Sequence, residues 1–359
     1  MGEEHGVLNP GDGRIASPHY LPVEDGTYLW GRLPCAADGA VLTIDPGESV
    51  TVDTLSHEGI LPDQGSDPLA FFRGHGVEPE GVLRDAVAVT ASRYQRDRVS
   101  DGPHVVTGPI RVRGARPGDL LKITVLGTAQ RVPYGVISNR HGRGALPGEY
   151  PAGAADVSVF ASVDADGRGS LPLGAHTDQR VSFALAPFLG IMGVAVAGET
   201  RAHSVPPGPH GGNIDINLLT VGSSIYLPVQ VDGALAYVGD PHFAQGDGEV
   251  ALTAMEASLR VDLRFDVLSR AEAIENFGTL AGPLVQTSEF LVPTGLDEDL
   301  DEAMRACVRA AIALLQARFG MEAHLAYAYL SAATDFNVSQ VVGLVKGVHA
   351  RIRVADFAH

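Results

Sequence analysis

Cysteine, tryptophan and basic side chains are scarce in this sequence of 359 residues. Its two cysteines, Cys35 and Cys307, lie far apart, which argues against the disulfide framework of a small secreted domain. Lysine and arginine number 26 against 43 acidic residues, so the formal net charge is -17. We therefore expect neither nucleic acid nor an anionic membrane as a partner, because both attract basic proteins.

Long apolar runs are absent as well, and we expect no leader sequence. No run of about 18 apolar residues occurs, so the sequence predicts no membrane span. The first residues carry neither the basic cluster nor the apolar stretch of a signal peptide. Together with the two separated cysteines, these features predict a cytoplasmic location.

Apolar residues and turn formers are abundant. A hydrophobic content of 45% and a charged content of 19% are typical of a globular protein with a full core. With 43 glycines and 23 prolines, the chain favours many turns over long helices. Alternating apolar and polar residues predict strands, which we place at 49–55, 110–114, 120–126, 181–185, 225–231 and 259–267. The charged residues of 259–267 are expected to face water.

Towards the C-terminus the spacing of apolar residues changes to three or four. This spacing from Leu296 to Phe319 predicts an amphipathic helix that Gly320 ends, with Cys307 on its buried stripe. Further helices are expected over 322–333 and from near Val338. The predicted fold is mainly β: a 1–40 N-terminal extension, a 41–267 β-rich sandwich body carrying the site, and a 268–359 helical C-terminal part packed on that body.

The segment 206–215 reads PPGPHGGNID. Its prolines predict a stiff loop, and its glycines predict a backbone that can come close to a bound group. Its two glycines, Gly211 and Gly212, permit backbone conformations that bring main-chain N–H groups near a ligand or an oxyanion. Asn213 and Asp215 alternate with isoleucines and would point to one side. The non-functional alternative is a bulged loop with a capping aspartate.

The segment 239–249 reads GDPHFAQGDGE and follows a predicted strand. Asp240 and His242 could converge on one ion, and Asp247 and Glu249 repeat their spacing. Glu249 precedes an apolar segment, where a carboxyl group acquires a raised pKa suited to acid–base catalysis. A cluster of solvated turn carboxylates is the alternative interpretation.

Isolated histidines and an arginine are weaker candidates. His104 could face the same cleft, and His57 ends the first predicted strand. Arg140 would bind a substrate carboxylate or offset local acidity. No serine-hydrolase elbow, zinc-protease helix or phosphate-binding loop occurs in the sequence, and neither cysteine lies in a polar loop beside a histidine, which disfavours cysteine catalysis.

Both glycine-rich segments resemble those of the acetamidase/formamidase family. Further matches are HVVTGP at 104–109, GARPGD at 114–119, LPV at 227–229 and GLDEDLD at 295–301. The resemblance runs from about Leu42 to Phe357. It implies a jelly-roll-like β-sandwich with a smaller α+β part, assembly into a homo-oligomer, and hydrolysis of a linear amide to a carboxylate and ammonia.

Two loops depart from the family pattern. The stretch SHEGI at 56–60 replaces an acidic, glycine-rich segment, and YGVISNRHG at 134–142 departs from the usual pattern of aromatic residues and glycines. The added histidine and arginine side chains indicate a substrate larger or more anionic than acetamide.

Amide hydrolysis without a nucleophilic side chain requires an activated water, which a divalent metal supplies. We expect His210, Asp215, Asp240 and His242 to bind it, with zinc favoured over calcium or magnesium. The catalytic residues would be Glu249, Asp247 and His104, and the substrate would contact Gly211, Gly212, Asn213, His57 and Arg140. The alternatives are a non-catalytic small-molecule-binding protein on the same fold and a purely structural metal.

Overall fold

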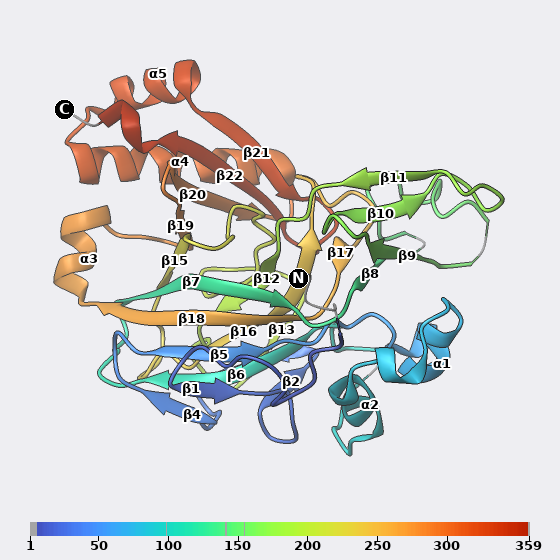
Figure 1. Ribbon diagram of the computed structural model, residues 1–359. Helices are drawn as coiled ribbons and strands as arrows, with labels where there is room; N and C mark the ends of the chain where they lie inside the picture. The colour runs from blue at the N-terminus through green and yellow to red at the C-terminus, as the bar shows by residue number, and fades with distance from the viewer. Residues whose placement is uncertain (1–5, 98, 141, 154, 358–359) are drawn as a thin grey trace.

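The computed structural model describes residues 6–97, 99–140, 142–153 and 155–357. They form two large β-sheets with helices at the periphery, and most of the helical residues lie in the C-terminal part (Figure 1). The prediction of a mainly β protein with C-terminal helices is confirmed. No described helix is long and apolar enough to cross a membrane.

The first sheet runs without a break from the N-terminal strand to the C-terminal ones. In spatial order its strands are β1 (His19–Leu21), β5 (Ser49–Asp53), β18 (Leu259–Leu268), β7 (Leu120–Gln130), β15 (Ser224–Pro228), β19 (Leu284–Gln286), β20 (Phe290–Asp297), β22 (Lys346–Arg353) and β21 (Asp335–Gln340). The predicted body and the predicted C-terminal part therefore share this sheet, because β15 of the body is hydrogen-bonded to β19 of the C-terminal part.

The second sheet carries most of the site. Its main path is β11 (Arg180–Phe183), β10 (Gly169–Pro172), β9 (Val157–Val163), β8 (Tyr134–Asn139), β17 (Met255–Glu256), β16 (Ala236–Ala244), β12 (Phe188–Gly193) and β14 (Gly211–Asn213). Strand β6 (Val105–Val112) pairs with β16 and also with β2 (Tyr28–Trp30) and β4 (Leu42–Ile44). A small ribbon pairs β3 (Arg32–Leu33) with β13 (Ala202–His203).

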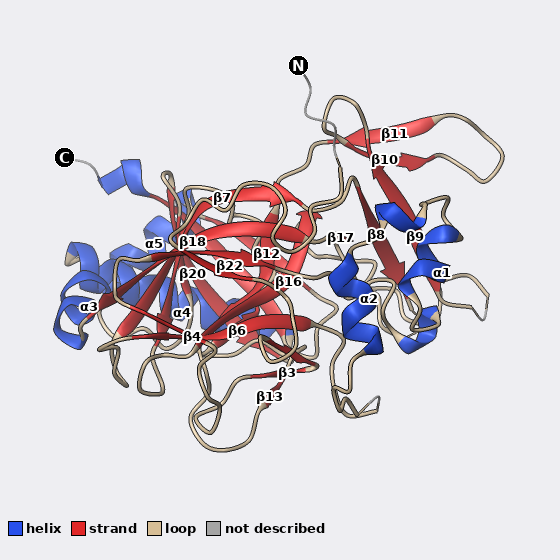
Figure 2. Ribbon diagram, turned by 60° about the horizontal axis from the view of Figure 1, so that its bottom comes forward, coloured by secondary structure: helices blue, strands red, loops and turns tan. Residues whose placement is uncertain are grey.

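The main core contains apolar side chains from both large sheets. Val52 and Phe265 of the first sheet belong to the same buried cluster as Ile110 and Val238 of the second. The helices lie at the two ends of the sheets: α1 (Pro68–Arg73) and α2 (Arg84–Ala91) at one end, and α3 (Arg270–Phe277), α4 (Leu300–Phe319) and α5 (Ala323–Ala333) at the other (Figure 2). Short 3-10 turns occupy Pro62–Gln64, Pro79–Gly81 and Val354–Phe357.

Helix α4 forms where the apolar spacing predicts it, but it begins at Leu300 rather than Leu296. Asp299 caps its start by accepting hydrogen bonds from the backbone N–H groups of Asp301 and Glu302. Gly320 ends it in the left-handed conformation, with φ of 64°. Cys307 is fully buried in the second core, which α4 forms with β20 and β22.

The helix expected from near Val338 is wrong. Strands β21 and β22 form an antiparallel pair there, and β22 also pairs with β20. Val348, Ala350 and Ile352 recur every second residue and are buried in the second core. A neighbouring strand from another part of the chain thus determines the local conformation.

The prediction that the charged residues of 259–267 face water is wrong for Arg260. Its side chain is 3% exposed and forms a bidentate ion pair with Asp53, at 2.6 Å and 3.0 Å. The N-terminal segment covers it, since Asn9 and Tyr20 accept further hydrogen bonds from the guanidinium. A buried charge of this kind requires such a set of partners.

Candidate active site

Three neighbouring strands of the second sheet bring the candidate side chains together. Strand β12 lies between β14 and β16, so Asp215, just beyond β14, reaches across β12 towards Asp240 and His242 on β16. Gly190 of β12 makes room for them. A Cβ atom there would lie 2.7 Å from Oδ2 of Asp240 and 2.7 Å from Cε1 of His242.

Buried histidine, aspartate and glutamate side chains form groups that could bind a metal ion. Within each group the potential ligand atoms lie within 4.8 Å of one another. Among the described residues these groups are His57, His104 and Asp240; Asp215, His242 and Glu249; and Asp240, His242 and Glu256. Asp240 and His242 each belong to two groups and therefore occupy the centre of the cluster.

The distances within the cluster centre on the carboxylate of Asp240. Its Oδ2 atom lies 3.2 Å from Nε2 of His242, which is also 3.1 Å from Oε1 of Glu256. Its Oδ1 atom lies 3.5 Å from Nδ1 of His57 and 3.7 Å from Nε2 of His104. The two carboxylate oxygens of Asp240 thus face different side chains: Oδ2 faces His242, and Oδ1 faces His57 and His104.

Several of these buried atoms have no hydrogen-bond partner among the described residues. They are both carboxylate oxygens of Asp215, Oδ1 of Asp240, Oε2 of Glu256, Nδ1 of His57 and both ring nitrogens of His242. Buried carboxylates need a cation or a proton to compensate their charge. Because the donors are imidazole nitrogens and carboxylate oxygens, the set fits a divalent cation.

Burial shifts the pKa values of the cluster in different directions. It raises the pKa of Asp215 well above its usual value, and the nearby Asp240 adds to this. Burial and the charge of Asp215 likewise raise the pKa of Glu249. Burial lowers the pKa of His104 to about 4, and its Nδ1 atom lies 3.0 Å from Oγ of Ser204.

His57 and Glu58 form a buried ion pair beside the cluster, with 3.4 Å between Nε2 and Oε1. Burial opposes its charged form, but the nearby carboxylates of Asp240 and Glu58 raise the pKa of His57 to about 10. Burial likewise opposes ionisation of Glu58, yet His57 lowers the pKa of Glu58 to about 2. The site therefore contains both a fixed charge pair and protonatable carboxyls.

Three site carboxylates stand on left-handed backbone. The φ angles are 49° at Asp215, 52° at Asp240 and 47° at Glu249. This conformation costs a residue with a Cβ atom about 1–2 kcal/mol. The strain is retained because these backbone turns aim the three side chains into one place.

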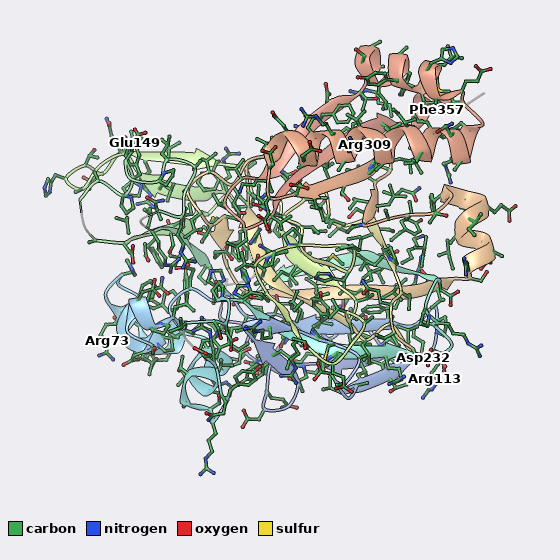
Figure 3. All side chains as sticks on the ribbon, turned by 180° about the vertical axis from the view of Figure 1, so that it is seen from behind. Arg73, Arg113, Glu149, Asp232, Arg309 and Phe357 are labelled. Atoms are coloured by element: carbon green, nitrogen blue, oxygen red, sulfur yellow. The ribbon has the colours of Figure 1, made fainter. Side chains whose placement is uncertain are left out.

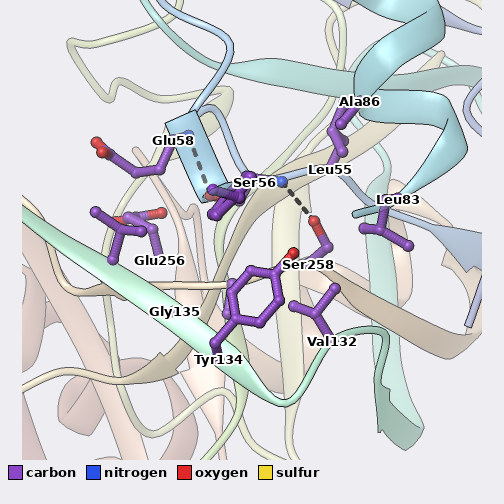
Figure 4. A pocket seen from close by; sticks show the side chains of 13 residues that line it. Leu55, Ser56, Glu58, Leu83, Ala86, Val132, Tyr134, Gly135, Glu256 and Ser258 are labelled. Carbon is purple, nitrogen blue, oxygen red and sulfur yellow. Dashed lines mark hydrogen bonds between the residues drawn. The ribbon is translucent and has the colours of Figure 1, made fainter. Parts of the chain in front are cut away.

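The cluster forms the floor of a cleft of about 1290 Å³. His57, His104, Asn213, Asp240 and Glu249 line this floor. On the other side of Glu58 and Glu256 lies a much smaller cavity of about 20 Å³, which is mainly apolar and large enough for about one water molecule (Figure 4).

Of the other predicted substrate contacts, Arg140 lines the cleft but is engaged by protein carboxylates. Its Nε atom donates to Asp63 at 2.5 Å, and its Nη2 atom lies 3.5 Å from Oε1 of Glu58. Asn213 lines the cleft, and its buried Oδ1 atom has no hydrogen-bond partner among the described residues. The backbone N–H of Gly211 donates to the carbonyl of Gly208, which leaves it unavailable for an oxyanion.

His210 and Asp247 lie outside the converging groups. His210 is buried, and its Nε2 atom packs near Gly212, where a Cβ would lie 3.1 Å from it. Burial lowers the pKa of His210 to about 4. Asp247 instead bonds to Asn217, to Asn337 at 2.7 Å and to Arg351 at 2.9 Å. It ties its loop to strands β21 and β22.

Sequence reasoning missed Glu256, Glu58 and Gly190. Glu256 is the single charge in the otherwise mostly apolar segment 250–257, and that isolation was the available signal. It lies opposite His242 in the pairing of β16 with β17. Glu58 follows His57 directly, whereas Gly190 carries no sequence signal of its own.

A model of the acetamidase/formamidase family matches residues 96–203 and 195–352. Because the two matched ranges together cover more than half of the sequence, the chain belongs to the acetamidase/formamidase family. The resemblance noted in the sequence is thereby confirmed.

Curated relatives and solved structures agree with this. The acetamidase of Mycolicibacterium smegmatis is 28% identical over 270 residues, covering 58% of this chain and 66% of the relative. The formamidase of Methylophilus methylotrophus is 30% identical over 240 residues, covering 54% of this chain and 58% of the relative. The matched region thus spans less than two thirds of either relative.

Whole-chain similarity appears at the level of structure. A crystal structure of an acetamidase from Bacillus halodurans matches with a TM-score of 0.72 and 25% identity, covering 94% of this chain and 98% of that one. An acetamidase from Yersinia enterocolitica matches with a TM-score of 0.74 and 24% identity, covering 99% and 97%. The fold is therefore shared along nearly its whole length.

Proposed function

We propose that this chain hydrolyses the C–N bond of a linear amide, giving a carboxylate and ammonia. The observation that carries the proposal is the buried cluster around Asp240 and His242 at the floor of the cleft, in a chain of this family. The related acetamidase and formamidase support the same reaction class. The complete acid–imidazole cluster favours an enzyme over a binding protein.

Asp215, Asp240 and His242 remain our proposed metal ligands, and Glu256 replaces His210 in that set. His57 and His104 face the other oxygen of Asp240. Mixed imidazole and carboxylate donors favour zinc, with calcium or magnesium as the alternatives. A bound divalent ion would acidify a water molecule and polarise the amide carbonyl.

Glu249 is the proposed proton carrier. The reaction forms a bond from a water oxygen to the carbonyl carbon and breaks the C–N bond, and the departing nitrogen must gain a proton. Burial and Asp215 raise the pKa of Glu249, so it can accept a proton from water and hold it for that nitrogen. Asn213 and His104 line the same floor and would orient the amide.

Two finer features are also proposed. A reducing compartment such as the cytoplasm is supported by the two cysteines, which are both buried and not joined in a disulfide. Assembly into a homo-oligomer is expected from the family resemblance alone.

The test is ammonia release from a panel of aliphatic, aromatic and carboxylated amides, with metal analysis on the same sample. We expect turnover of at least one linear amide, loss of turnover after chelation, and recovery with zinc. Binding of amides without any ammonia release by the metal-loaded protein would instead support the non-catalytic alternative. A chelator that lowers the melting temperature but leaves turnover intact would assign the metal a structural role.

A further inference from the structure

The cleft above the cluster is much larger than acetamide or formamide requires. Its volume of about 1290 Å³ exceeds the roughly 300–1,000 Å³ that holds a drug-sized ligand. Its walls carry the cationic side chains Arg96, Arg140, Arg143 and Lys346, in a chain whose formal net charge is -17. The same lining also carries six acidic side chains, so the cations that matter for a ligand are those that the protein's own carboxylates leave unpaired.

Two of these cations are not engaged by protein carboxylates. Arg143 and Lys346 form no ion pair with any described residue, whereas Arg140 is held by Asp63 and Glu58. The acidic residues at the cleft mouth are themselves engaged: Asp63 by Arg140, Asp101 by Arg32 at 2.6 Å, and Asp156 by a neighbouring group. Arg143 and Lys346 are therefore available to a ligand.

Arg143 stands on a turn, and Lys346 begins β22 directly after a turn; both turns are hydrogen-bonded to the residues flanking Glu249. In the turn of Arg143, Ala145 donates to the carbonyl of Val250 at 2.8 Å. In the turn before Lys346, Val341 donates to the carbonyl of Gly248 at 3.1 Å. The loop that carries the proposed proton carrier is thus held between two turns, and a cation that lines the cleft lies in one turn and directly after the other.

We infer that the substrate is a linear amide that also bears a carboxylate, such as the monoamide of a short dicarboxylic acid, bound through Arg143 and Lys346. This inference rests on the proposed amide hydrolysis and names its substrate class. The carboxylate would be held at the wall while the amide carbonyl reaches the floor. Arginine suits this role because its guanidinium bonds both oxygens of a carboxylate.

The test compares succinamate with pentanamide, a neutral amide of similar length, by ammonia release from the metal-loaded protein. We expect kcat/KM to be at least tenfold higher for succinamate at low salt, with the preference falling as ionic strength rises. Arg143→Met and Lys346→Met should each raise KM for succinamate about three- to tenfold, because the contacts are partly solvent-exposed. Pentanamide kinetics should change less than twofold.

Arg309→Met provides the matched control. Arg309 is an exposed arginine on α4 that does not line the cleft (Figure 3). Arg143→Glu should reverse the preference towards neutral or cationic amides without changing the melting temperature. Equal turnover of both amides by the unmodified chain, or equal losses for both in the variants, would overturn the inference. Failure to release ammonia from any amide would instead overturn the proposed function.

Discussion

A Cβ atom on Gly190 would lie 2.6 Å from Oδ1 of Asp215. The two residues come from neighbouring segments of the second sheet, and the same missing side chain also leaves room for Asp240. Glycine at position 190 is therefore a requirement of the cluster and not of the strand itself, because its own backbone needs no unusual conformation.

Gly190→Ala should displace the carboxylates and lower both metal content and kcat by at least tenfold. Overpacking a buried site in this way typically costs about 1–3 kcal/mol, so the protein should remain folded with a lower melting temperature. Gly282→Ala is the control, since a Cβ there meets no atom within 4 Å. Full metal content and activity in Gly190→Ala would show that the cluster does not act as one site.

Glu249→Gln should lower kcat by about 10²–10⁴-fold, because the amide side chain cannot carry the proton. The variant should fold normally, since Gln is close to Glu in size and the raised pKa of Glu249 indicates a group that is stable when uncharged. Steady-state ammonia assays and thermal melting measure the two effects. The exposed Glu149, changed to Gln, serves as the control (Figure 3).

Asp247→Ala separates a positioning role from a catalytic one. Asp247 anchors the Glu249 loop to Arg351 and Asn337 and does not reach the cluster. We expect kcat to fall about tenfold through misplacement of Glu249, with KM nearly unchanged, and Asp247→Asn to recover most of the loss. Equal losses of a hundredfold or more in both variants would restore the catalytic role that the sequence suggested. Asp335→Ala, an exposed change on β21, should have no effect.

Asp53→Asn tests the buried ion pair with Arg260. Removing the carboxylate leaves the guanidinium buried without its partner, which should cost about 3–5 kcal/mol in the free energy of unfolding. Denaturant titration measures the change. Glu302→Gln breaks the solvent-exposed pair with Arg305 and should change stability by less than about 1 kcal/mol. Similar losses in both variants would mean that the N-terminal segment does not shield Arg260 from water.

The site was predictable where a local segment carries its own chemistry. The loops around Asp215 and Asp240 combine glycines with acids and imidazoles, so their polar side chains could be expected to face a ligand. The period of α4 likewise revealed its buried stripe. These signals are local because turns and helices depend on neighbouring residues.

Other features depend on contacts between distant segments. Gly190 matters only because two other strands approach it, and Arg260 is buried only because the N-terminal segment crosses it. The strand pair β21–β22 forms beside β20, and the local sequence pattern did not predict that pairing. His210 has the composition expected of a ligand, yet the path of its loop places it apart from the converging atoms.

The left-handed backbone at Asp215, Asp240 and Glu249 lowers the stability of the fold, while the side chains at these positions form the candidate site. Glycine would adopt these angles without the steric cost that a Cβ atom brings, so glycine there would relax the backbone while deleting the reactive groups. The chain thus has carboxylate residues at three positions where glycine would adopt the backbone conformation with less strain. Selection for thermal stability alone would therefore be expected to replace these three residues with glycine and remove the side chains of the candidate site.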